Sequence, residues 1–127
     1  MEKLEAKLRS CLRFAQIRSE IRGNPKPQVT VRWLLKLWQR QRGICPIFHL
    51  KMTMKGSLGV TLDQIKPGKF YTRKNTQLVA QAANAFKGTM TMQETRSLLS
   101  SIKRVSAPRK SISPRQAYKL AIGSKVP

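Results

Sequence analysis

One carboxylate and one carboxamide in the middle of the chain have the types and spacing to form a small polar site. Asp63 is the only aspartate among the 127 residues. It follows the β-branched and apolar run Val60-Thr61-Leu62, which is typical of a strand. Asn84 lies further along, in a segment with a helical pattern. A strand that delivers a carboxylate and a helix that delivers an amide oxygen could hold Mg2+, because hard divalent cations prefer oxygen ligands.

The segments around these residues indicate the elements that must position them. A turn-rich stretch, Lys66-Pro67-Gly68-Lys69, follows the strand, and residues 76–87 have the pattern of a helix that ends near Gly88. His49 is the only histidine, with no second His or Cys at ligand spacing. We interpret it as structural, and a role in activating water is the alternative.

Several short motifs follow one another along the chain around Asp63. They are Cys45, Leu50 and Met52, then Leu62-Asp63-Gln64-Ile65, Phe70-Tyr71, Asn75-Thr76-Gln77-Leu78-Val79 and Asn84-Ala85-Phe86-Lys87. This spaced set, preceded by the helix-like segment Trp33–Gly43, resembles the phage-type HNH, or ββα-metal, endonucleases over residues 30–97. The resemblance suggests a bacteriophage or bacterial origin.

The resemblance implies a role for each matched position. Asp63 and Asn84 would hold Mg2+, and Asn75 would pin a loop through side-chain to backbone hydrogen bonds. Gln64 stands where the wider HNH group has a histidine base, and an amide that does not titrate cannot act as a general base. Lys66 stands where the family pattern has a second acid. The paired CxxC knuckles of zinc-bearing relatives are absent, so we expect no zinc.

The charge of the chain predicts a polyanionic partner. Lysine and arginine number 26 against five acids, for a formal net charge of +21, and such a chain repels itself unless a polyanion compensates. DNA is the favoured partner and RNA is the alternative. The basic residues expected to contact phosphates are Lys66, Lys69, Arg73, Lys74 and Lys87 near Asp63, Arg32, Lys36, Arg40 and Arg42 on the second helix, and Arg13 and Arg18 on the first.

The predicted fold class is α+β and mostly helical, with a small HNH-like ββα core at residues 30–104 flanked by basic terminal helices. Residues 1–24 form a basic amphipathic helix, which the Pro25-Lys26-Pro27 linker follows. Thr30 caps the next helix, to about residue 42. Residues 44–54 are predicted as a strand and turn. The capping box at residues 91–94 opens another helix, and residues 105–127 form a basic linker and a short helix at 115–122.

Both tryptophans fall in the second predicted helix. We expect Val31, Leu34, Leu35, Leu37 and Trp38 to be core residues and Trp33 to lie partly on the flank. Two large core anchors are the favoured interpretation, and stacking of Trp33 on a nucleobase is the alternative.

Other features of the chain bear on its compartment. The two cysteines do not define a disulfide framework, no apolar run approaches the ~20 residues of a membrane span, and the start of the chain lacks the order of a secretory signal. We therefore expect an intracellular protein that is neither secreted nor bound to a membrane.

These observations lead to one favoured function and two alternatives. The favoured one is a nucleic-acid-binding protein on an HNH-like scaffold, with impaired catalysis and binding mainly through phosphates. The first alternative is a Mg2+-dependent endonuclease or nickase. The second is a basic structural subunit of a larger nucleoprotein, such as a ribonucleoprotein or transcription complex.

Overall fold

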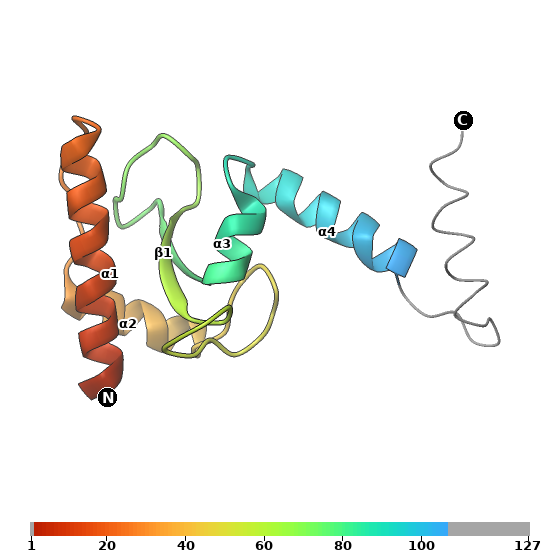
Figure 1. The fold of residues 1–127 in the computed structure, drawn as a ribbon, viewed down its shortest axis with the longest axis horizontal. Coiled ribbons are helices and arrows are strands. Elements are labelled where there is room, and N and C mark those ends of the chain that lie inside the picture. The colour runs from red at the N-terminus through yellow and green to blue at the C-terminus, as the bar shows by residue number, and fades with distance from the viewer. Residues whose placement is uncertain (1, 107–127) are drawn as a thin grey trace. The chain divides into compact units, whose positions relative to one another are not determined.

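The computed structural model describes residues 2–106 (Figure 1). The elements in chain order are α1 (Glu2–Ile21), α2 (Val31–Gln41), β1 (Val60–Gln64), β2 (Thr76–Ala80), α3 (Gln81–Lys87) and α4 (Met92–Ser106). The class is α+β and mostly helical, as predicted. The helix predicted at residues 115–122 lies outside the described residues.

A two-stranded antiparallel sheet followed directly by a helix forms the centre of the first compact unit, residues 1–92. Val60 pairs with Ala80 and Gln64 with Thr76, so β1 and β2 are in register along their full length. Residues 65–75 connect the strands, and α3 begins at the residue after β2. The chain order at this point is therefore strand, loop, strand, helix.

The prediction of a helix over residues 76–87 is wrong for its first half. Residues 76–80 are strand β2, and only 81–87 are helical. All five residues of β2 are buried, which an amphipathic helix with one packed face would not allow. A short apolar run does not distinguish a buried strand from a buried helix by periodicity, and pairing with β1 decides the matter.

The outer edge of β2 is covered by side chains. The Gln41 amide nitrogen donates to the carbonyl of Leu78 at 2.8 Å, and the Leu78 amide donates to the Gln41 side-chain oxygen at 3.0 Å. Two residues along, the Ala80 amide donates to the Cys45 sulfur at 3.4 Å. The end of α2 and the segment after it thus satisfy an edge that would otherwise expose unpaired backbone groups.

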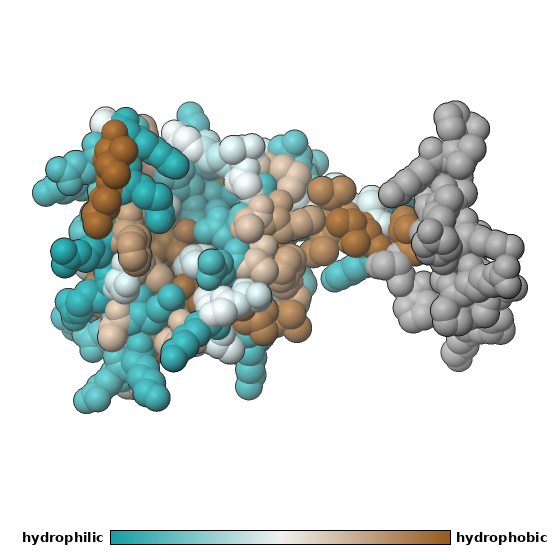
Figure 2. Space-filling model, in the orientation of Figure 1, coloured by the Kyte–Doolittle hydropathy of each residue, from teal (hydrophilic) through white to brown (hydrophobic). Residues whose placement is uncertain are grey.

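Helix α1 packs on α2 and β1 within the same unit. Its buried residues are Leu8, Leu12, Ala15 and Ser19. The Cys11 thiol donates to the Val60 carbonyl at 3.3 Å, which ties the helix to β1. On another face of α1, Phe14, Ile17 and Ile21 are exposed, and Figure 2 shows an apolar strip on this helix.

Helix α2 begins at the predicted cap. The Trp33 amide donates to the Thr30 hydroxyl at 3.1 Å, and the helix ends with Arg42 and Gly43 in the left-handed region at φ 56° and 66°. Only Leu34 is buried. The other residues predicted to be core are half-buried, Val31, Leu35, Leu37 and Trp38. The contacts of α2 with α1 and β2 leave the rest of this face partly open to solvent.

The segment between α2 and β1 has no regular strand, contrary to the prediction for residues 44–54. It contains two isolated bridges, between Ile44 and Lys51 and between Thr53 and Gly59. Cys45, Ile47 and Met52 are buried. The segment therefore folds as an irregular loop held by its apolar side chains.

A second unit begins at residue 93, and the structure describes its residues 93–106. They belong to α4, which begins within the predicted capping box and ends at Ser106. Leu98, Ile102 and Val105 are exposed along it. Across residues 2–106, no helix combines the length and apolarity required to cross a membrane.

Candidate functional site

A cleft of about 450 Å³ lies beside β1 in the first unit. It is lined by Arg18, Arg22, Thr61, Leu62, Asp63, Gln64, Pro67, Gly68, Tyr71, Asn84, Lys87, Gly88 and Thr89. Three residues singled out in the sequence, Asp63, Gln64 and Asn84, therefore come together at one place. They come from the end of β1 and from α3, as the strand–loop–strand–helix order requires.

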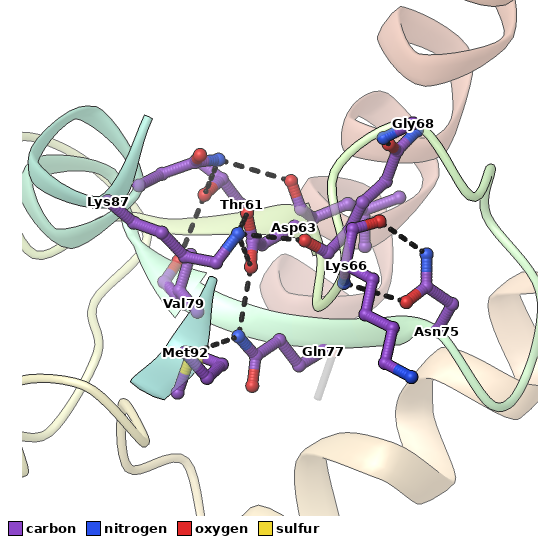
Figure 3. A network of polar contacts seen from close by, with 12 residues as sticks. Thr61, Asp63, Lys66, Gly68, Asn75, Gln77, Val79, Lys87 and Met92 are labelled. Atoms are coloured by element: carbon purple, nitrogen blue, oxygen red, sulfur yellow. Dashed lines mark hydrogen bonds and ion pairs between the residues drawn. The ribbon is translucent and has the colours of Figure 1, made fainter. Parts of the chain in front are cut away.

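The Asp63 carboxylate is paired with the Lys87 ammonium inside the protein (Figure 3). The Lys87 nitrogen lies 3.3 Å from each of the two carboxylate oxygens and donates to the Gln64 carbonyl at 2.9 Å. The side chains are 6% and 0% exposed for Asp63 and Lys87. The Gln77 amide also donates to Asp63, at 2.9 Å. Both charges of this pair are therefore internal to the fold.

Burial controls the titration of this carboxyl group. Removal from water raises the pKa of Asp63 above its ordinary value, because desolvation disfavours the charged form. The hydrogen bond from Gln77 and the positive charge of Lys87 act in the opposite direction and hold back part of the rise.

The arrangement of these side chains is a poor fit to Mg2+. Lys87 contacts both carboxylate oxygens, and a divalent cation placed there would face a like charge in a region of low dielectric. Among residues 2–106, no group of three or more His, Cys, Asp or Glu side chains could hold a metal. Mg2+ binding at Asp63 would require Lys87 to move away.

The two carboxamides of the predicted centre make structural contacts. The Asn84 amide nitrogen donates to the Thr61 hydroxyl at 3.1 Å and to the Leu62 carbonyl at 3.2 Å, which joins α3 to β1. The Gln64 side-chain oxygen accepts from the Gly68 amide at 3.1 Å, so Gln64 holds the first turn of the loop. His49, the alternative group for activating water, is exposed and is not among the residues that line the cleft.

Asn75 pins the loop between the strands, in the manner the sequence indicated. Its side-chain oxygen accepts from the Lys66 amide at 2.8 Å. Its amide nitrogen donates to the carbonyls of Lys66 at 3.1 Å and Phe70 at 2.9 Å. Asn75 is buried, and Phe70 is held at φ 61°. One side chain therefore sets the path of the chain along one wall of the cleft.

Arg18 of α1 and Arg22, which directly follows α1, reach the same cleft. Arg18 donates to the Tyr71 hydroxyl at 3.4 Å, and Arg22 lines the cleft beside it. The Tyr71 carbonyl accepts from the Gln28 amide at 2.7 Å, which fixes the loop to the linker after α1. Arg18 was expected to contact phosphates. Tyr71 belongs to the Phe70-Tyr71 motif but was assigned no role, and Arg22 was not singled out for this site.

The other basic residues predicted to contact phosphates are exposed, with one exception. The exposed ones are Lys66, Lys69, Arg73 and Lys74 on the loop, Arg32, Lys36, Arg40 and Arg42 on or next to α2, and Arg13 and Arg18 on α1. Lys87 is the exception, because it is 1% exposed and its ammonium is paired with Asp63. With this pair in place, Lys87 cannot reach a phosphate at the surface.

The position of Lys87 on α3 accounts for its burial. Ala83 and Lys87 are four residues apart, so they share one face of a helix, and both are buried. Gln77, the second partner of Asp63, belongs to the motif Asn75-Thr76-Gln77-Leu78-Val79. The helix predicted for that segment did not place it opposite Asp63, where the pairing of β2 with β1 puts it.

Comparison of the chain with models of protein families, with curated proteins and with solved structures finds no match.

Proposed function

We propose that this protein binds nucleic acid, with DNA as the favoured ligand. It binds mainly through phosphates and does not hydrolyse them. The observation that carries the proposal is the charge distribution at the cleft. Asp63, the only aspartate of the chain, is neutralised by Lys87 within the fold, whereas Arg18 and Arg22 line the same cleft. The cleft therefore offers positive charge and hydrogen-bond donors to an anion.

The chemistry of the ligand follows from these donors. Guanidinium groups match the geometry of phosphate oxygens, and the Tyr71 hydroxyl beside Arg18 can also donate. The exposed lysines and arginines of the 65–75 loop and of α2 extend the positive charge beyond the cleft. Contacts of this kind bind the backbone of a nucleic acid irrespective of its sequence.

The absence of hydrolysis follows from the groups at the end of β1. Gln64 does not titrate, so it cannot deprotonate water, and its side-chain oxygen already accepts a hydrogen bond from Gly68. The carboxylate that would be needed for a metal is engaged by Lys87 and Gln77. The HNH-like scaffold would thus serve as a platform for binding.

Fluorescence anisotropy with labelled duplex DNA over a salt series tests the binding. We compare a variant that combines Arg18→Gln and Arg22→Gln with a control that combines Arg9→Gln and Lys55→Gln. Both double variants lower the net charge by two, but the control residues are exposed and do not line the cleft. We expect the cleft variant to lose more affinity and to lower the log–log salt slope by about 0.9 for each phosphate that it no longer neutralises.

The outcomes separate the proposal from its competitors. If the two double variants lose the same amount of affinity for duplex DNA, the cleft is not part of the binding surface. An absence of binding at low salt in the unmodified protein would overturn the proposal altogether.

A Mg2+-dependent endonuclease or nickase is the second candidate, because Asp63, Gln64 and Asn84 line one cleft. In that case Lys87 would leave the carboxylate when DNA and metal bind. Nicking of supercoiled plasmid with Mg2+ or Mn2+, compared with EDTA, distinguishes the two. Nicking that needs metal and is lost in Asp63→Asn would establish the enzyme, whereas binding without nicking supports the first proposal.

A further inference from the structure

The two tryptophans of α2 have different environments, although they lie five residues apart. The ring of Trp38 packs against the backbone of Gly43, where an added Cβ would lie 2.7 Å from Cζ2 of the ring. Gly43 is buried at φ 66°, so Trp38 closes the end of the helix. Trp33 instead lines a surface depression of about 440 Å³. The structural role of a large anchor is therefore filled by Trp38.

The surroundings of Trp33 are basic and polar. The other residues that line the depression are Lys36, Gln39 and Arg40, and all three are exposed. Trp33, Lys36 and Arg40 are three and four residues apart, so they form a row on one face of α2. The Arg40 guanidinium carbon lies over one face of the Trp33 ring, 5.7 Å from its centroid, in a cation–π contact. A base that stacks on Trp33 would therefore use the other face of the indole or take the place of Arg40.

We infer that Trp33 is a stacking platform for an unpaired nucleobase, with Lys36 and Arg40 bound to the phosphates on either side of it. An aromatic ring next to cations is an arrangement by which proteins hold single strands, because every base has a face that can stack. A base inside a duplex is already stacked on both faces, so the ligand class is single-stranded nucleic acid. This inference rests on the proposed nucleic-acid binding and adds to it a second site outside the Asp63 cleft.

The test uses the full chain and two ligands of equal length and charge. One is a single-stranded oligo-dA, and the other is an abasic oligonucleotide that keeps the phosphates but has no bases. We expect Trp33→Ala to weaken binding of oligo-dA by about 5- to 150-fold, the range for loss of one stacked base. Binding of the abasic strand should stay unchanged, and Trp33→Phe should restore most of the affinity for oligo-dA.

Tryptophan fluorescence gives a second readout, in which each tryptophan in turn is replaced by phenylalanine. Trp38→Phe leaves Trp33 as the only tryptophan, and Trp33→Phe leaves Trp38. We expect oligo-dA to quench the fluorescence of Trp33 in Trp38→Phe but not the fluorescence of Trp38 in Trp33→Phe. The abasic strand should quench the fluorescence of neither variant. Quenching of Trp38 alone, or equal binding of oligo-dA by Trp33→Ala and the unmodified protein, would overturn the stacking site.

Failure of this inference is distinguishable from failure of the proposed function. If duplex DNA binds but Trp33→Ala changes nothing for oligo-dA, the stacking site is wrong and the phosphate cleft stands. If the unmodified protein binds neither duplex, oligo-dA nor the abasic strand at low salt, both are wrong.

Discussion

Lys87 and Asp63 form an ion pair between the last residue of α3 and the fourth residue of β1, with the ammonium 3.3 Å from both carboxylate oxygens. The two residues are 24 positions apart in the chain. Their contact joins the helix to the strand and also decides the chemistry of the cleft, because it places a fixed positive charge on the only aspartate. Lys87 therefore serves the fold and limits what the cleft can bind.

Removing Lys87 should destabilise the protein strongly. Lys87→Met leaves a buried carboxylate without its counter-charge, for which we expect a loss of about 3–5 kcal/mol in the free energy of unfolding. The exposed Lys69→Met is the matched control and should change stability by no more than about 0.5 kcal/mol. Urea denaturation measures both. The combined Lys87→Met and Asp63→Leu variant should recover much of the loss, because an apolar pair leaves no charge uncompensated. Equal stability of the two single variants would contradict the buried pair.

The raised pKa of Asp63 has a defined effect on stability against pH. At pH values between the ordinary pKa of 3.8 and the higher pKa of the folded state, Asp63 keeps its proton in the folded protein but has lost it in the unfolded chain. The unfolded state is therefore favoured as pH rises through this window, and the contribution of this group to stability falls. Denaturation of the unmodified protein and of Asp63→Asn, across acidic to neutral pH, isolates the effect.

We expect the stability of the unmodified protein relative to Asp63→Asn to decrease as pH rises through that window, and to be constant above it. The opposite slope would mean that attraction by Lys87 outweighs burial and lowers the pKa.

The side chain of Gln41 should contribute to stability by completing the edge of β2. Gln41→Leu has a similar volume but leaves the Leu78 amide and carbonyl without their partners, and each unpaired buried group costs about 1–3 kcal/mol. Gln39→Leu lies on the same helix at an exposed position and should be nearly neutral. Amide hydrogen exchange gives a local readout, since Leu78 should lose protection in Gln41→Leu and keep it in Gln39→Leu. Unchanged protection at Leu78 would show that another group covers the edge.

Divalent cations should not stabilise the protein through Asp63. A ligand that binds the folded state raises the melting temperature by mass action, and Lys87 holds the position that a cation would need. We expect the same Tm in Mg2+ as in sodium chloride of equal ionic strength. Lys87→Gln, which removes the competing charge, is the variant most able to respond. A saturable rise in the unmodified protein that disappears in Asp63→Asn would instead favour the nuclease.

Local signals in the sequence were sufficient for several elements. The spacing of apolar residues predicted α1, and Thr30 marked the start of α2, where its hydroxyl accepts from Trp33. The run Val60-Thr61-Leu62 predicted β1. The motif positions predicted that Asp63, Gln64 and Asn84 belong together, and they line one cleft. In each case the deciding interactions lie within a few residues or follow from the order of the elements.

Contacts between distant residues decided the rest. Residues 76–80 are a strand because they pair with β1 and receive Gln41 on the outer edge. A run of five residues is too short for its periodicity to distinguish a buried strand from a buried helix. The burial of α2 is likewise set by its contacts with α1 and β2, which leave only Leu34 fully buried.

The sequence by itself determined the charge of the chain, its class and the identity of the polar residues around Asp63. Only the tertiary structure decided that Lys87 faces inward. A lysine is expected to be a surface cation, because burying its charge alone is costly. Here the carboxylate of Asp63 on β1 offsets this cost. Asp63 lies 24 residues before Lys87, too far along the chain for a local sequence pattern to connect the two. The same contact determines whether the cleft presents a free carboxylate to a metal or positive charge to a phosphate.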